Sequence, residues 1–252
     1  MYVSPNGTQL CGLADVGDNA NEPLIATAEH THGTPAKLRV LLLRRHAAES
    51  MRVVQSFDLS STIKKFTSFA HWPGWNLFCA VLGSNSLHEL CRSQGASTFD
   101  TIPRVHLLPE EVITICGLQT YGECRLAVSF GDKTLRVFRV AGATLCELQR
   151  LPRPDATFWE PRELLALPGG SLILRSRLAD AANSETVIDA IECCAAQQDG
   201  SLARSNRLHV PDIELFLIGL LPTTDVWPTL CIAAFECSFY FSASILYSRC
   251  KD

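Results

Sequence analysis

The sequence contains one cluster of histidines, within Glu29-His30-Thr31-His32-Gly33. Two histidines that are two residues apart on a strand face the same side, so they could share a metal ion. A zinc site needs further ligands, and the sequence identifies no third cysteine or acidic residue that belongs with this pair. The favoured interpretation is a solvated loop between two strands, and we predict neither a metal nor a cofactor.

The eleven cysteines suggest three other kinds of chemistry, which are metal binding, disulfide formation and thiol catalysis. They are scattered without any Cys-x-x-Cys spacing, which argues against zinc. Most lie in apolar runs such as Phe78-Cys79-Ala80 and Leu230-Cys231-Ile232, where a thiol behaves as a small buried hydrophobe. The adjacent pair Cys193-Cys194 would be strained as a disulfide, so we expect half-buried strand residues there.

Aromatic and basic residues could bind a partner. His71-Trp72-Pro73-Gly74-Trp75 holds two of the four tryptophans, and an exposed tryptophan pair could anchor a peptide or stack a base. A turn packed over a sheet edge is the more ordinary interpretation. The basic doublets Arg44-Arg45 and Lys64-Lys65 are too few for a nucleic-acid groove, so RNA is expected only through other proteins. Phosphate-loop, dinucleotide and serine-nucleophile motifs are absent from the sequence.

The overall composition is that of a folded, mildly acidic chain. The 252 residues carry a net charge of −4, with 47% apolar and 19% charged residues, which excludes disorder and a basic tail. The first residues, Met1–Gly7, have neither a basic nor an apolar stretch typical of a signal peptide. Together with the reduced thiols, this start indicates a cytoplasmic or nuclear protein.

A hairpin pattern recurs along the chain. Each copy has a short apolar run, a polar turn that usually carries glycine, and a second alternating run, which is typical of a β-hairpin. The copies lie at residues 24–43, 78–92, 126–140, 164–178 and 231–245. Their second strands begin at Leu38, Leu87, Leu135, Leu172 and Phe239, at intervals of 49, 48, 37 and 67 residues. We expect an insertion at 180–185 to explain the long last interval.

A period of 40–50 residues with four strands per unit is typical of β-propeller blades. We therefore predict an all-β fold, a β-propeller of about five four-stranded blades in one domain over residues 1–252. The expected blades are 1–60, 61–110, 111–153, 154–212 and 213–252. The last unit ends after its third strand, so we expect an incomplete propeller or closure by the N-terminal strand or by a partner.

Further strands complete these units. Met51–Leu59, Phe99–Leu107 and Thr144–Leu151 are predicted to end blades, and Lys65–His71, Val112–Leu118 and Ile213–Leu220 to open the next ones. The best helix candidate, Ser184–Gln198, would serve equally well as a strand. Residues 229–247 are apolar enough to suggest a membrane anchor, but Glu236 and the alternating aromatic residues favour buried strands.

One hairpin, Leu126–Val140, resembles the central hairpin of a WD-repeat blade. The matching positions are Ala127, Ser129, Asp132, Thr134 and Leu135-Arg136-Val137, with Phe138-Arg139 in place of the Trp-Asp dipeptide. No Gly-His or Trp-Asp dipeptide is present, so the hydrogen-bond network of the family is not carried over. The chain is also similar to the degenerate propellers of coat, nucleoporin and RNA-modification assemblies, a resemblance that implies binding of proteins.

We therefore predict a non-enzymatic scaffold or adaptor subunit that binds proteins within a multisubunit complex. The expected binding loops surround Gly83–Ser86, Gly131–Lys133 and Pro168–Gly170, with blade junctions near Ser60–Lys65 and Pro152–Pro154. No catalytic, cofactor-binding or metal-binding residue is assigned.

Two alternatives remain open from the sequence. The first is a propeller hydrolase such as a glycosidase. A glycosidase would need inward-facing acids from several blades, and Glu110-Glu111 together with Asp58, Asp100, Asp132 and Asp212 are the acids considered. Their positions are too scattered in register to favour this chemistry. The other alternative is a propeller tethered to a membrane by residues 229–247.

Overall fold

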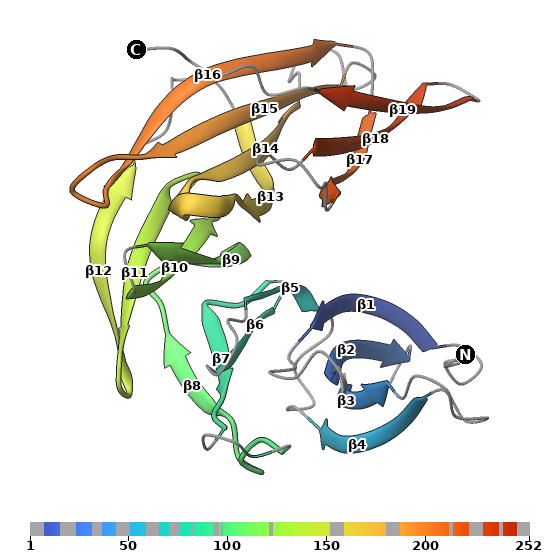
Figure 1. Ribbon diagram of the computed structural model, residues 1–252, viewed down its shortest axis with the longest axis vertical. Helices are drawn as coiled ribbons and strands as arrows, with labels where there is room; N and C mark the ends of the chain where they lie inside the picture. Colours follow the sequence, from blue (N-terminus) through green and yellow to red (C-terminus); the bar gives the residue numbers. More distant parts are fainter. Residues whose placement is uncertain are drawn as a thin grey trace. The chain divides into compact units, whose positions relative to one another are not determined.

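The computed structural model consists of antiparallel β-sheets (Figure 1). It describes residues 8–15, 24–31, 37–43, 51–58, 66–70, 76–81, 83–92, 96, 98–120, 123–151, 159–179, 187–211, 214–221, 229–236 and 239–245. Within these ranges the only helical element is one 3-10 turn, η1 (Pro168–Gly170). The prediction of an all-β chain is therefore confirmed, and none of the described sheets closes on itself.

Five sheets follow one another along the chain, and in each sheet the strand order is the sequence order. The strands of the first two are β1 (Thr8–Asp15), β2 (Leu24–Thr31), β3 (Lys37–Leu43), β4 (Met51–Asp58), β5 (Phe66–Ala70), β6 (Leu77–Val81), β7 (Ser86–Leu90) and β8 (Arg104–Leu107). Those of the third are β9 (Val112–Thr120), β10 (Glu123–Phe130), β11 (Leu135–Ala141) and β12 (Thr144–Leu151). The fourth has β13 (Trp159–Ala166), β14 (Leu172–Ala179), β15 (Val187–Ala196) and β16 (Leu202–Pro211), and the three-stranded fifth has β17 (Glu214–Leu221), β18 (Thr229–Glu236) and β19 (Phe239–Ile245).

The predicted hairpins are all present. They appear as the antiparallel pairs β2–β3, β6–β7, β10–β11, β13–β14 and β18–β19. Glycines with positive φ make two of the turns, at Gly83 (74°) and Gly169 (79°), where a side chain on Cβ would strain the backbone. A four-stranded antiparallel meander of this kind is the unit from which β-propeller blades are built.

The predicted repeat was out of phase in the fourth sheet. Its hairpin at 164–178 joins the first and second strands, whereas the other four hairpins join the second and third. Counted from the third strand, the units begin at Lys37, Ser86, Leu135, Val187 and Phe239, which are 49, 49, 52 and 52 residues apart. The repeat is therefore regular, and the predicted insertion is not needed to explain the spacing.

Three other predictions can be compared with the strands. The fourth sheet contains β15 where Ser184–Gln198 was the helix candidate, so the strand alternative is correct. The strand predicted at Phe99–Leu107 begins only at Arg104, because residues 101 and 102 bend the chain before it. In the stretch 229–247, β18 and β19 pair as strands. No helix in the described part of the chain is long and apolar enough to cross a membrane.

The chain divides into two compact units, residues 1–152 and 153–252. Within the first unit the opening strands of successive sheets are neighbours, since β1 lies against β5 and β5 against β9. Within the second unit β13 likewise lies against β17. Contact between the first strands of consecutive sheets is what a propeller-like arrangement of blades requires.

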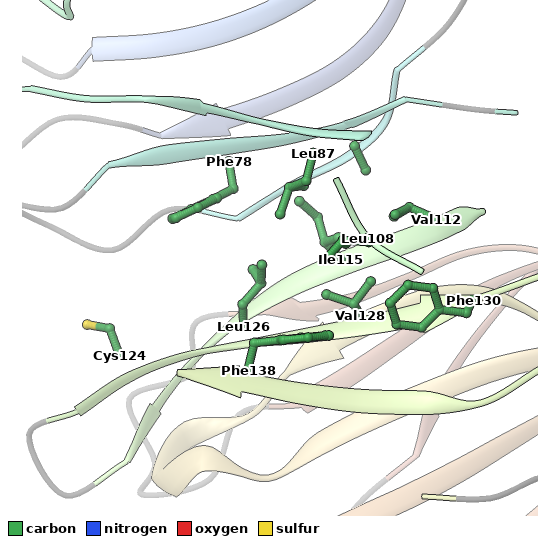
Figure 2. Close-up of a cluster of buried hydrophobic side chains, with 11 residues drawn as sticks. Phe78, Leu87, Leu108, Val112, Ile115, Cys124, Leu126, Val128, Phe130 and Phe138 are labelled. Atoms are coloured by element: carbon green, nitrogen blue, oxygen red, sulfur yellow. The ribbon is translucent and has the colours of Figure 1, made fainter. Parts of the chain in front are cut away.

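The sheets β5–β8 and β9–β12 share a hydrophobic core (Figure 2). Phe78 and Leu87 point from the second sheet toward Leu126 and Val128 of the third, with Ile115 between them. All five side chains are buried because both sheets turn an apolar face toward each other. This packing holds the two sheets together, and their turns form the surface described below.

We predict that Leu126→Ala lowers the free energy of unfolding by about 3 kcal/mol, because it leaves a cavity where the two sheets meet. Urea denaturation of the full chain measures this change. The matched control is Leu148→Ala, at a side chain that is 43% exposed on β12, and its effect should stay within about 0.5 kcal/mol. Equal effects of the two variants would contradict the shared core.

Candidate interaction surface

The turn between β6 and β7 is closed by its own serines. The hydroxyl groups of Ser84 and Ser86 lie 2.7 Å apart, and the Ser86 amide donates a hydrogen bond to Ser84 Oγ at 3.0 Å. Local bonds of this type satisfy backbone groups that a tight turn leaves without ladder partners. Because these bonds fix the turn, the carbonyl groups of Ser84 and Asn85 are positioned to accept hydrogen bonds from the next part of the chain.

The connection between β8 and β9 is hydrogen-bonded to the turns on both sides of it. The amides of Leu108 and Val112 donate to the carbonyl groups of Asn85 and Ser84, each at 2.8 Å, and the Asn85 side chain donates back to Leu108 O at 3.0 Å. In the next sheet, the Gly131 amide donates to Glu111 O at 2.9 Å. We call Gly83–Ser86, Leu108–Val112 and Gly131–Lys133 the connection surface.

The tip of this connection faces solvent. Pro109, Glu110 and Glu111 are exposed, while Leu108 and Val112 on either side are buried. No ion pair joins either glutamate to a described residue. The surface thus presents two free carboxylates on a backbone that is fixed at both ends.

The turn between β10 and β11 is built around Asp132. Its carboxylate accepts hydrogen bonds from the Thr134 amide (2.9 Å) and hydroxyl (2.6 Å) and from the Arg136 guanidinium (2.8 Å). Arg136 is itself buried and lies over the ring of Phe130, 4.5 Å from its centre. Burial acts to raise the pKa of Asp132, but these hydrogen bonds and the Arg136 charge hold it below its usual value.

Ser129 shows how this hairpin departs from the WD-repeat pattern. Its hydroxyl is fully buried and has no hydrogen-bond partner. Phe138, which stands in place of the family's tryptophan, lies in the apolar core instead. The hydrogen bonds that brace this hairpin join Asp132, Thr134 and Arg136.

A buried carboxylate holds the opposite end of the second sheet. Glu89 on β7 is inaccessible to solvent, and its carboxylate contacts His106 Nε2 at 2.6 Å and an Arg104 guanidinium nitrogen at 2.9 Å. The Asn76 amide donates to its other oxygen. Arg104 also donates to Gly142 O at 3.3 Å, so the cluster reaches the turn between β11 and β12.

Glu89 is charged because its partners outweigh its burial. Burial acts to raise its pKa, but the hydrogen bonds from His106 and Asn76 and the positive charge of Arg104 bring the pKa below its usual value. Sequence reasoning missed this cluster. The signal was present in the alternation of Arg104 and His106 on the last strand of a sheet, because residues two apart share a face.

The outer strand β8 has one polar and one apolar face. Arg104 and His106 turn toward Glu89, whereas Val105 and Leu107 are 51% and 77% exposed. Ile102, just before the strand, is 82% exposed. We call Ile102, Val105 and Leu107 the apolar row.

The other residues singled out in the sequence are not gathered into a site. Glu29, His30 and Thr31 belong to β2, but their side chains, like His32, Gly33 and the tryptophan cluster 71–75, lie outside the described residues. The basic doublets, Ser60–Lys65, Pro152–Pro154, Asp212 and the Asp58 side chain are outside them too. Asp100 is exposed near the start of β8, far along the chain from Asp132. No group of His, Cys, Asp or Glu side chains in the described part could hold a metal ion.

No disulfide joins the cysteines whose side chains the structure describes, which are Cys79, Cys91, Cys116, Cys124, Cys146, Cys193 and Cys194. Cys194 is fully buried and Cys193, its neighbour on β15, is half-buried, as expected for successive residues on a strand. Burial raises the pKa of Cys194 to about 12 and that of Cys124 to about 11, which removes the reactive thiolate at neutral pH.

We predict that Glu89→Gln destabilises the full chain by about 1–3 kcal/mol, since Arg104 and His106 lose a buried charged partner. Because the pKa of Glu89 is lower in the folded than in the unfolded state, its ionisation stabilises the folded state. This stabilisation is complete above about pH 4.3, the ordinary pKa of glutamate, and is lost as the pH falls through the folded-state pKa. Urea titrations from pH 7 to pH 3 should show the difference from wild type shrinking below that point. The exposed control Glu110→Gln should have little effect at any pH, and a pH-independent difference would contradict this account.

We also predict that Cys194 resists alkylation in the native protein, because its thiol is both buried and protonated. Iodoacetamide treatment at pH 8 followed by peptide mapping measures the labelling. Half-buried Cys193 provides the internal reference, and both should react in urea. Equal labelling of the two under native conditions would contradict the packing of β15.

Comparisons with known proteins identify the fold. No protein-family model matches the chain, and no curated protein matches its sequence. Among solved structures, a candidate 6-phosphogluconolactonase from Bacteroides uniformis is similar with a TM-score of 0.62 and 12% identity, over 97% of this chain and 72% of that one. The Malassezia sympodialis allergen Mala s 1 is similar with a TM-score of 0.59 and 11% identity, over 90% and 72%. Sqt1 of Chaetomium thermophilum is similar with a TM-score of 0.56 and 13% identity, over 93% and 71%.

These likenesses extend over nearly the whole chain, but the identities are too low to transfer an activity. One similar protein is named for an enzyme and another is an allergen, so the fold serves proteins of different kinds. The comparisons and the repeated four-stranded sheets together support a β-propeller-like fold.

Proposed function

We propose that this chain is a non-enzymatic scaffold that binds partner proteins through the connection surface. In this proposal the five sheets are WD-like blades of one propeller, which is closed by a strand from the N-terminus or from a partner. The protein would work within a multisubunit complex of the cytoplasm or nucleus. Two of the loops predicted to bind partners, Gly83–Ser86 and Gly131–Lys133, belong to the connection surface.

The observation that carries the proposal is the fixed, exposed tip between β8 and β9. Hydrogen bonds from Leu108 and Val112 on one side, and from Gly131 on the other, hold the backbone around Glu110 and Glu111. A loop that is ordered before binding loses little conformational entropy when a partner docks. Exposed carboxylates on such a loop favour a basic partner surface and accelerate encounter with it.

The paired acids support a structural role in preference to hydrolysis. Glu89 is paired with Arg104 and His106, Asp132 with Arg136, and Glu192 with Arg204 at 2.5 Å. Each carboxylate is in an ion pair within its own sheet. A glycosidase needs two acids that converge on one bond, with one of them protonated. These three acids instead belong to three different sheets, and each is paired with a basic residue.

The proposal predicts that a tagged full-length chain loses partners when the tip is reversed in charge. In Glu110→Lys/Glu111→Lys, repulsion of a basic partner should reduce its recovery in affinity purification about tenfold or more. Quantitative mass spectrometry against wild type measures the loss, and raising the salt concentration should weaken wild-type capture in the same direction.

The matched control is Asp100→Lys, which reverses an exposed acid in the connection before β8. It should leave recovery unchanged. Equal recovery of partners by the tip variant and wild type, with both folded by circular dichroism, would contradict the proposed docking surface.

A further inference from the structure

The outer edge of β8 is open. This strand is the last in its sheet and pairs only with β7, so its other edge has no strand partner among the described residues. An open edge presents unpaired backbone N–H and C=O groups, which can accept a further strand. Proteins usually protect such an edge with charged side chains.

The equivalent strand β12 has more of this protection than β8, whose one partly exposed charged side chain, Arg104, is paired with Glu89. The exposed residues of β12 include Glu147 and Arg150, which form an ion pair at 3.0 Å beside the partly exposed Leu148. The exposed residues of β8 are Val105 and Leu107. Its charged Arg104 and its His106 are instead engaged by Glu89 on the opposite face. The open edge of β8 is therefore the more apolar of the two.

Two acidic residues, Glu110 and Glu111, follow the apolar row in the chain. The chain passes from Leu107 through buried Leu108 to the exposed Glu110 and Glu111, whose backbone is fixed by the connection surface. Neither carboxylate has an ion-pair partner among the described side chains. An occupant that complements this surface has large apolar side chains along β8 and positive charge beside the tip.

We propose that β8 binds an extended segment of a partner protein by strand addition, with alternating apolar residues beside the apolar row and basic residues beside Glu110 and Glu111. This inference rests on the proposed scaffold function and names its mode of binding. Backbone hydrogen bonds would supply much of the affinity, and the side chains next to Val105 and Leu107 the selectivity. For an antiparallel segment, the basic residues lie at its N-terminal end, because the tip follows β8 in the chain.

The test uses the full chain and fluorescent synthetic peptides. The probe has two N-terminal lysines followed by alternating valine and threonine, one counter-probe has glutamates in place of the lysines, and a second has a central proline. Proline removes a donor and cannot join the strand ladder, and glutamate repels the tip. Fluorescence anisotropy should show binding of the first probe, with binding of each counter-probe weaker by about tenfold or more.

Two variants locate the site. Leu107→Lys adds a charge to the apolar row and should weaken probe binding about tenfold, whereas the control Leu148→Lys on β12 should not. Hydrogen exchange provides a second readout, in which the probe should slow exchange of the backbone amides in β8 but not in β12. Because Leu107 is largely exposed, its replacement should leave the fold intact, as circular dichroism can check.

Several results would overturn strand addition. These are no binding of the probe, equal binding of the proline peptide, an unchanged affinity in Leu107→Lys, or a dimer of the full chain that Leu107→Lys dissociates. Loss of partner capture in Glu110→Lys/Glu111→Lys with full capture by Leu107→Lys would leave the scaffold function standing and reject β8 as its docking strand. Unchanged capture in both variants would reject the scaffold function itself.

Discussion

The hydrogen bonds between the β8–β9 connection and the turns beside it hold the second and third sheets in place. A chain that leaves one sheet and enters the next must satisfy its backbone groups outside either ladder. Here the carbonyl groups of Ser84 and Asn85 receive the amides of Val112 and Leu108, and Glu111 receives that of Gly131. These bonds fix the position of one sheet beside the other. Leu108 and Val112 lie in the shared core, so only Pro109, Glu110 and Glu111 face solvent.

Charge is used inside these sheets mainly to hold strands together. Asp132 organises a turn from within, and Glu89 ties Asn76, Arg104 and His106 at the other end of the second sheet. Removing one partner of a buried ion pair is strongly destabilising, because it leaves a buried charge without compensation. The intact pair itself adds little net stability. Such clusters therefore specify one arrangement of strands, and they orient β8 so that its apolar side chains face outward.

Much of the fold could be predicted from the sequence because hairpins are local. Glycine turns and alternating runs located β6–β7 and β10–β11, but the strong Pro168–Gly170 turn was assigned to the wrong pair of strands. Turn chemistry marks where a strand reverses and does not say which strand of the sheet it is. The Glu89 cluster was missed for a related reason, since its partners come from β8, fifteen or more residues away, and only the pairing of strands brings them together.

Docking of partners on β8 and on the β8–β9 connection can be tested directly by site-specific photo-cross-linking. A photoreactive amino acid would be placed at Glu110 in the full chain, and a second chain would carry it at Gln198, exposed in the β15–β16 turn. Illumination in cells should yield a discrete cross-linked product from the first position and none from the second. Equal products from both positions, or products from Gln198 alone, would contradict this docking.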